Sequence, residues 1–239
     1  MASVFRFRQF DVRQENAAMK VGTDSDLLGS LGAGGSRILD IGTGTGVLSL
    51  MMAQRFPEAR ITAVEIDDNA VLDAGYNFSH SPFAERITLH HLSFQQYLAE
   101  AGDVPLFDSV ICNPPYFDRS LECPDLGRSR ARHSSSLPFD VLAQGAYRLL
   151  EEGGLFSVCI PPEVLEPFCA ECQFAGFTLK YNYQIKSLPQ KGPKRYVLVH
   201  QKGRVEPVQT FTYCMRNEDH TRSQWYLDQM KDFLLLSSK

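Results

Sequence analysis

The sequence lacks long apolar runs. Its longest apolar stretches, residues 46–53 and 155–162, each span about eight residues, whereas a membrane-spanning helix needs roughly 20. The first residues carry arginines, but they have neither the apolar core nor the small-residue cleavage site of a secretory signal. These absences exclude a transmembrane protein and predict a cytoplasmic one.

Cysteine is also scarce. Six cysteines in 239 residues are too few for a disulfide scaffold. Cys169 and Cys172 have the spacing of half a zinc site, but no second pair of cysteine or histidine ligands stands near them in the sequence. We interpret the two as buried thiols on one helix, and we expect no metal.

A strong charge of one sign is missing from the chain as a whole. The formal net charge is −4, which gives no general indication of a nucleic-acid partner. Residues 172–205, however, contain no Asp or Glu, while Lys and Arg recur throughout that interval. This pattern predicts a local basic face.

What is present is the composition of one globular domain with a large core, 44% hydrophobic and 22% charged. From residue 36 onward, strand-like apolar runs alternate with stretches of helical period. The expected strands are 37–41, 60–66, 87–91, 107–112 and 155–160, and the expected helices are 46–56, 69–80, 94–101, 139–150 and 162–176. Two further strands, 177–187 and 194–201, form an antiparallel hairpin across a turn that contains Pro and Gly.

This alternation predicts a single α/β domain over residues 1–239. We expect a Rossmann-like, mostly parallel seven-stranded sheet with an antiparallel C-terminal hairpin and helices on both faces. Residues 206–239 are expected to cap the core with a short extended piece and a helix at 225–235. Residues 118–136 form a long irregular stretch, which in a compact domain usually has a functional role.

A glycine-rich turn follows the first strand in LDIGTGTG. Glycine allows the backbone to approach a ligand closely, and the turn residues expected to bind a cofactor are Gly42, Thr43, Gly44 and Gly46. Val47 replaces the third glycine of a dinucleotide-binding GxGxxG turn, and Asp40 before the turn would repel a pyrophosphate. A carboxylate there suits a cationic cofactor, and S-adenosylmethionine carries both a sulfonium and an α-ammonium group.

An acidic residue ends the second strand. Glu65 can accept hydrogen bonds from both ribose hydroxyls of an adenosine group, and Ile66 would then lie beside the adenine ring. Ser93 and Phe94, after the third strand, are candidates for contacts around the adenine amino group. These positions suit S-adenosylmethionine and a dinucleotide equally well.

The sequence Asn113-Pro114-Pro115-Tyr116 follows the fourth strand, at the edge where open α/β sheets bind ligands. An exocyclic amino nitrogen is a poor nucleophile because its lone pair is delocalised into the ring. The Asn113 side-chain carbonyl and the Pro114 backbone carbonyl can each accept one N–H of that group and stabilise its developing positive charge. Pro115 holds the turn rigid, while Tyr116 and Phe117 offer rings for stacking an extruded base. We therefore assign catalytic roles to Asn113, Pro114 and Tyr116, and we also expect Asn113 to lie beside the cofactor.

LDIGTGTG, the acid in AVEID and NPPY together resemble the class I S-adenosylmethionine-dependent methyltransferases that modify planar amino nitrogens. The order FRFRQF, KVGTD, NPPYF and PKRYVLVHQ is similar, across nearly the whole chain, to that of the small bacterial tRNA methyltransferases that methylate the 6-amino group of adenine 37 in valine tRNA. The resemblance implies S-adenosylmethionine as cofactor and tRNA as substrate. We expect a monomer.

In that family the segment ahead of the first strand folds over the cofactor. The resemblance therefore implies that residues 1–35 cover the cofactor, and the neighbours it implies are Lys20, Gly22, Thr23 and Asp24. Ser25 departs mildly from the small residue that usually follows Thr-Asp in the family's motif.

Basic residues in three segments are candidates for contacts with tRNA phosphates. They are Arg6, Arg8 and Arg13 near the start, Arg128, Arg130, Arg132 and His133 in the long irregular stretch, and Lys191, Lys194 and Arg195 in the hairpin turn. We assign substrate contacts to Arg132, Lys194 and Arg195, besides the three aromatic and proline residues 115–117. An anticodon loop suits such an enzyme, because a base leaves a single-stranded loop at little cost.

Other functions share parts of this pattern. A protein glutamine methyltransferase also fits an NPPY site, but such enzymes usually carry a helical domain that residues 1–35 are too few to form. Methylation of a guanine amino group in RNA also fits the site, whereas DNA adenine methylation would need a target-recognition insert. From other classes, an NAD(P)-dependent oxidoreductase shares the glycine turn, and a non-catalytic binder of S-adenosylmethionine shares the cofactor site.

Overall fold

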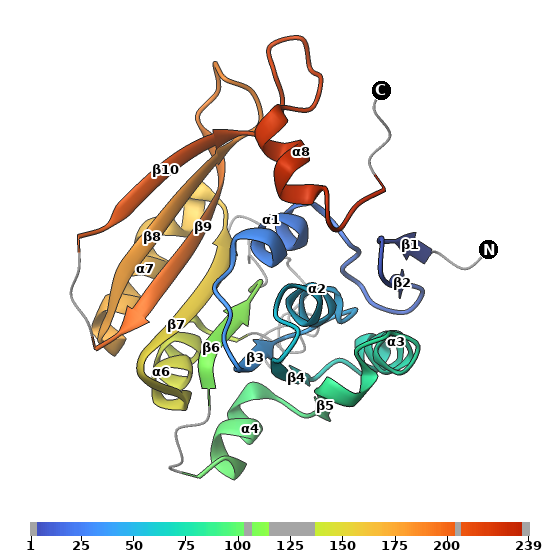
Figure 1. The fold of residues 1–239 in the computed structure, drawn as a ribbon. Helices are drawn as coiled ribbons and strands as arrows, with labels where there is room; N and C mark the ends of the chain where they lie inside the picture. Colours follow the sequence, from blue (N-terminus) through green and yellow to red (C-terminus); the bar gives the residue numbers. More distant parts are fainter. Residues whose placement is uncertain (1–3, 103–106, 115–136, 204–206, 236–239) are drawn as a thin grey trace, which may run out of the picture.

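A computed structural model describes residues 4–102, 107–114, 137–203 and 207–235 of the chain. Its centre is an eight-stranded sheet in the order β10-β8-β9-β7-β6-β3-β4-β5 (Figure 1). The parallel strands are β3 (Arg37–Ile41), β4 (Arg60–Glu65), β5 (Ile87–His91), β6 (Phe107–Cys112) and β7 (Leu150–Ile160). These strands form because short apolar runs such as RILDI are buried on both faces of a parallel sheet.

The C-terminal strands complete the sheet at one edge. β9 (Pro193–Lys202) is antiparallel both to β7 and to β8 (Phe177–Lys186). The last strand, β10 (Gln209–Cys214), pairs parallel with β8 at the outer edge. A separate N-terminal hairpin is made by β1 (Val4–Arg6) and β2 (Asp11–Arg13).

Helices cover both faces of the sheet and form two hydrophobic cores. The helices on one face are α1 (Thr23–Leu31), α2 (Val47–Arg55), α3 (Asp68–Ser79) and α8 (Gln224–Met230). Those on the other face are α4 (Phe94–Glu100), α6 (Phe139–Leu149) and α7 (Leu165–Ala175). Figure 1 shows α6 and α7 on one side of the sheet and α1 and α2 on the other. In the part of the chain that the structure describes, every helix is too short or too polar to cross a membrane.

The strand order reverses next to β3. The chain adds β4 and then β5 on one side of β3, and it returns to place β6 on the other side. In open α/β sheets, such a reversal leaves a crevice at the carboxyl ends of the strands, where ligands bind. The residues that follow β3, β4 and β6 are therefore the candidates for a ligand-binding site.

The predicted α/β fold with a mostly parallel sheet is confirmed, but the sheet has eight strands rather than seven. The segment 209–214, expected only to cap the core, adds β10 to the edge because its backbone pairs with β8 in full register. Strand β7 also begins at Leu150 rather than at residue 155. The helix expected at 225–235 is α8, which ends at Met230.

His200 on β9 is a fully buried histidine. Its ring lies 6.1–6.2 Å from the rings of Phe156, Phe168 and Phe177, and its Nδ1 has no hydrogen-bond partner among the described residues. Burial in this apolar cluster lowers the pKa of His200 to about 3. The imidazole is therefore neutral in the folded protein at physiological pH.

His200 should make the protein sensitive to acid. Its pKa in the unfolded chain is about 6.5, so the unfolded state binds more protons as the pH falls from 6.5 toward 3, and stability decreases across that window. Between pH 7 and pH 5, the wild type should lose about 2 kcal/mol more unfolding free energy than His200→Leu, which cannot titrate. Urea denaturation at the two pH values measures this difference, and equal losses in both proteins would contradict the assignment.

Candidate functional site

The glycine turn after β3 adopts a backbone that only glycine accommodates easily. Gly42, Gly44 and Gly46 have φ angles of +68°, +59° and +83°. A Cβ added at Gly42 or Gly44 would meet nothing within 4 Å, so both face open space. At Gly46 the same atom would lie 2.4 Å from the Phe78 ring. The first two glycines thus form an open floor, while the third packs against α3.

Asp40 lies beneath this turn rather than on its surface. The side chain is fully buried and accepts hydrogen bonds from Thr43 Oγ1 at 2.6 Å and Ser49 Oγ at 2.7 Å. Burial raises the pKa of Asp40 to about 6, although both hydrogen bonds favour the charged form. Asp40 therefore supports the turn from the protein interior and does not line the cavity at the carboxyl edge of the sheet.

Glu65 ends β4 and is joined to the turn. One carboxylate oxygen accepts the Gly44 N–H at 2.8 Å, and the other accepts the N–H groups of Ile66 and Asp67 at 2.9 Å. Only 8% of Glu65 is exposed, whereas Ile66 next to it is 45% exposed. The three backbone bonds fix the carboxylate at the carboxyl edge of the sheet.

A cavity of about 670 Å³ opens at this edge, a volume within the usual range for small-molecule sites. It brings together most of the residues predicted to bind a cofactor: Lys20, Gly22, Thr23, Asp24, Gly42, Thr43, Gly44, Glu65, Ile66, Ser93, Phe94 and Asn113. Gly46 and Asp40 are the two predicted cofactor residues that do not line it. Leu92, Leu137 and Met215 also line the cavity. They could not be predicted, because hydrophobic residues at such positions are common in any sequence.

Ser93 has a structural role as well as a place in the cavity wall. Its hydroxyl accepts the Gln96 N–H at 3.1 Å, and its own N–H donates to the Gln96 side chain at 2.9 Å. This reciprocal pair is a capping box that begins α4. Phe94 follows it, buried in the core on the α4 side of the sheet.

The N-terminal segment forms one wall of the cavity, as the family resemblance implies. Residues 17–20 and 22–25 line it directly. Lys20 Nζ donates to the Gln14 carbonyl, and the Gln14 side chain accepts the Val21 N–H at 2.8 Å. These bonds close residues 14–21 into a loop, called the cover loop below.

Lys194 and Arg195 also line this cavity. They lie at the start of β9, the strand expected at 194–201, directly after the hairpin turn. Arg195 Nε donates to Asp24 Oδ1 at 2.7 Å, an ion pair between side chains that are 24% and 23% exposed. The pair joins β9 to the start of α1, a contact between residues 171 positions apart that no local pattern could indicate.

The adjacent carboxyl, Asp26, is buried in α1. Burial raises the pKa of Asp26 to about 7; Arg222 opposes this shift and Asp24 adds to it. The folded protein therefore holds a proton on Asp26 over part of the range near neutral pH.

Asn113 follows β6 and reaches the same cavity, with Pro114 buried behind it. The remaining motif residues, Pro115, Tyr116 and Phe117, lie outside the described residues, as does Arg132 with the rest of residues 118–136. The structure thus places the first residue of the NPPY motif within the cavity that Glu65 and the glycine turn line.

The other predicted groups fall elsewhere. Arg8 Nε donates to the Leu234 carbonyl, and Arg13 pairs with Glu15. Cys169 and Cys172 lie on α7, where burial raises the pKa of both thiols. Among the residues that the structure describes, no group of three or more potential ligands is placed to hold a metal ion.

The two kinds of glycine in the turn should respond differently to substitution. Gly44→Ala adds only the cost of a positive φ, roughly 1–2 kcal/mol, because space is free around the new methyl group. Gly46→Ala adds overlap with Phe78 and should destabilise the protein by roughly 1–3 kcal/mol more. Urea denaturation measures the loss of unfolding free energy in both variants. Equal losses would mean that the Phe78 ring moves aside at no cost, which would contradict the prediction.

Comparisons with known proteins indicate the family to which the chain belongs. The family model described as "Methyltransferase small domain" matches residues 19–159. A Bacteroides thetaiotaomicron protein named tRNA1(Val) (adenine(37)-N6)-methyltransferase is 46% identical over 246 residues, and the match covers 97% of each chain. A Phocaeicola vulgatus protein of the same name is 42% identical over 233 residues, again with 97% of each chain covered.

Solved structures share the fold. A predicted O-methyltransferase from Agrobacterium tumefaciens superposes with a TM-score of 0.69 at 21% identity, covering 88% of this chain and 96% of that one. The T. thermophilus 16S rRNA N2 G1207 methyltransferase, in complex with AdoMet and guanosine, gives a TM-score of 0.55 at 20% identity over 84% of this chain and 50% of that one. These likenesses support the fold, and the identities to the curated relatives assign the family: the chain belongs to the tRNA1(Val) (adenine(37)-N6)-methyltransferases.

Proposed function

We propose that this protein transfers a methyl group from S-adenosylmethionine to the 6-amino group of adenine 37 in valine tRNA. The observation that carries the proposal is that Asn113, at the end of β6, lines the same cavity as Glu65 and the glycine turn. A methyl acceptor held at Asn113 would therefore meet a cofactor held by the other two. The names and the identities of the curated relatives support the choice of substrate.

The residues of the cavity fit S-adenosylmethionine. Glu65 presents a fixed carboxylate of the kind that binds ribose hydroxyls, and Ile66, Leu92 and Phe94 offer apolar walls for the adenine ring. At the other wall, the open floor at Gly44 and the groups of the cover loop and α1 suit the charged amino-acid portion. When bound, the cofactor supplies an electrophilic methyl group on a positively charged sulfur.

Asn113 and Pro114 activate the acceptor nitrogen. The Asn113 side-chain carbonyl and the Pro114 backbone carbonyl each accept a hydrogen bond from the adenine amino group. Both bonds strengthen as the nitrogen becomes tetrahedral and partly positive, so they stabilise the transition state more than the bound substrate. Pro115, Tyr116 and Phe117 complete the proposed site by holding the turn and stacking on the extruded base.

Two of the proposed tRNA contacts, Lys194 and Arg195, also line the cavity. Lys194 is exposed beside Arg195 on β9, and we place tRNA phosphates against Lys194, Arg195 and Arg132. Arg195 also pairs with Asp24, so it connects the side that meets the RNA with the wall that meets the cofactor. The protein is proposed to act as a monomer in the cytoplasm, where its tRNA substrate is found.

Replacing Glu65 tests the cofactor site. Glu65→Ala should weaken S-adenosylmethionine binding by about 2–4 kcal/mol, roughly 30- to 900-fold, because two ribose hydroxyls lose a charged acceptor in a largely buried site. Glu65→Gln is the matched control; it keeps the volume and one acceptor oxygen, so its loss should be smaller. Isothermal titration calorimetry measures both, and a dissociation constant unchanged in Glu65→Ala would refute the assignment.

Replacing Asn113 tests the chemistry. Asn113→Ala should lower the rate of methyl transfer at least ~100-fold and leave S-adenosylmethionine affinity nearly intact, because the lost bond acts mainly in the transition state. Asn113→Asp keeps an acceptor oxygen and should retain more activity than Asn113→Ala. Single-turnover transfer to tRNA at saturating cofactor isolates this step.

The outcome for the two Asn113 variants is decisive. If both variants reacted as fast as the wild type, Asn113 would be only a turn residue. The proposed activation of an amino nitrogen would then be wrong.

A further inference from the structure

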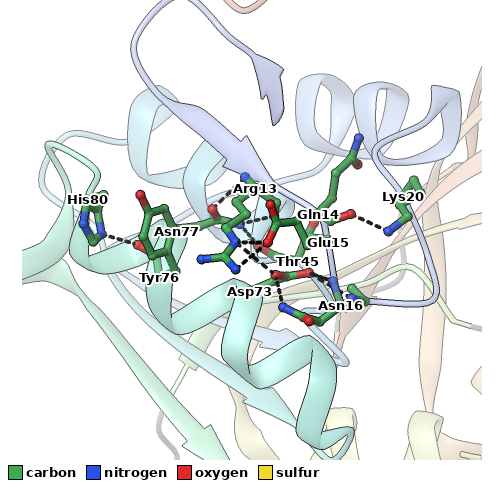
Figure 2. A network of polar contacts seen from close by, with 11 residues as sticks. Arg13, Gln14, Glu15, Asn16, Lys20, Thr45, Asp73, Tyr76, Asn77 and His80 are labelled. Carbon is green, nitrogen blue, oxygen red and sulfur yellow. Dashed lines mark hydrogen bonds and ion pairs between the residues drawn. The ribbon is translucent and has the colours of Figure 1, made fainter. Parts of the chain in front are cut away.

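Two buried polar residues of α3 face the N-terminal segment instead of solvent (Figure 2). Asp73 is fully buried and Asn77 is 2% exposed. They are four positions apart and therefore lie on one face of the helix, the face that also buries Ala70, Ala74 and Phe78. A carboxylate and a carboxamide are costly at such positions unless their hydrogen bonds are satisfied.

Asp73 holds the chain where the cover loop begins to follow the cavity wall. Its Oδ2 accepts the N–H groups of Asn16 and Ala17, each at 2.8 Å, and its Oδ1 accepts the Asn16 side-chain amide at 2.9 Å. Arg13 Nε lies 3.9 Å from the same carboxylate. Three donors from two consecutive residues thus converge on one side chain, and Ala17, the second of these residues, already lines the cavity.

Asn77 holds the same segment three residues earlier. Its Oδ1 accepts the Arg13 N–H at 2.8 Å, and its Nδ2 donates to the Arg13 carbonyl at 2.8 Å, so the carboxamide pairs with both backbone groups of Arg13. The second N–H of Nδ2 donates to the Thr45 carbonyl at 2.8 Å. Asn77 therefore connects the N-terminal segment directly to the glycine turn.

Polar contacts add to the limited apolar packing of the cover loop, in which Ala17 is buried and Val21 packs against the core. Met19 at its tip is 66% exposed, and within the loop Gln14 bonds to Lys20 and Val21. At the base of the loop, Asp73 and Asn77 make the hydrogen bonds that join this segment to α3. Helix α3 begins at Asp68, shortly after Glu65. The same helix therefore follows the proposed ribose acceptor and holds the cover loop.

We infer that Asp73 and Asn77 are positioning residues for the cofactor: they hold the cover loop against the glycine turn before S-adenosylmethionine binds, although neither side chain lines the cavity. The inference rests on the proposed placement of the cofactor. A loop that is already ordered does not have to be ordered during binding, so the anchors raise affinity without any contact with the ligand. They should affect cofactor binding far more than the chemical step.

Isosteric variants test the inference. Asn77→Asp keeps the acceptor for the Arg13 N–H but sets a second oxygen against the Arg13 and Thr45 carbonyls. Asp73→Asn replaces one acceptor oxygen by an amide group that faces N–H donors. In each variant the dissociation constant for S-adenosylmethionine should rise at least tenfold by calorimetry, while the single-turnover rate at saturating cofactor should stay within about threefold of the wild type. Trypsin should cleave after Lys20 faster than in the wild type when no cofactor is present.

A matched control separates positioning from general destabilisation. Phe177→Leu lies in the core on the opposite face of the sheet and should lower the melting temperature while leaving cofactor affinity unchanged. If Phe177→Leu weakened binding as much as an anchor variant with the same melting temperature, the inference would be overturned. If Asp73→Asn does not fold, Asn77→Ser, which shortens the side chain without setting a donor against a donor, replaces it in the same comparison.

Glu65→Ala distinguishes the inference from the proposal on which it rests. If Glu65→Ala loses affinity while both anchor variants bind as the wild type does, the cofactor placement stands and the positioning role is wrong. If Glu65→Ala itself binds normally, the placement fails, and the inference fails with it.

Discussion

Strands β3, β4 and β6 run parallel and end side by side, so the residues that follow them must meet at one edge of the sheet. The glycine turn follows β3, Glu65 closes β4, and Asn113 follows β6. The Glu65 carboxylate then bonds to the Gly44 N–H and ties two of these three endings together. The cavity, its proposed cofactor and the proposed chemistry all depend on that convergence.

The segment ahead of β3 adds a wall to this open edge of the sheet. Polar groups attach it at two places: Asp73 and Asn77 hold the cover loop to α3, and Arg195 holds Asp24 to β9. One attachment is on α3, which follows β4, and the other is on β9; these two strands lie on opposite sides of β3 in the sheet.

Local sequence patterns predicted the central elements well. Strands β3, β5 and β6 have the expected bounds, because each is a short apolar run between turn residues. Two elements were not predicted from local patterns. Strand β10 pairs with β8, a partner distant in the sequence. Helix α1 has the mixed sequence TDSDLLGSL, which shows little apolar periodicity. Asp40 was expected to contact the cofactor. Its place in the sequence could not show that the glycine turn folds over its side chain.

The anchors on α3 did leave a signal in the sequence. Asp73 and Asn77 share the helical spacing of Ala70, Ala74 and Phe78, so they occupy the positions of a core-facing stripe. A polar residue on such a stripe requires a partner, and the sequence could not name that partner because the bonds of Asp73 to Asn16 span 57 positions. The role of Asn113 was predicted from its motif alone, and the residue lines the cavity.

The central claim is that an adenine amino group of tRNA accepts the methyl group at this edge of the sheet. The most direct measurement incubates the protein with radiolabelled S-adenosylmethionine and separate tRNA, ribosomal RNA, DNA and protein fractions, then digests the labelled fraction to its monomers. The account predicts label in tRNA alone, recovered as N6-methyladenosine. Label in another fraction, or in tRNA on a guanine, would contradict it.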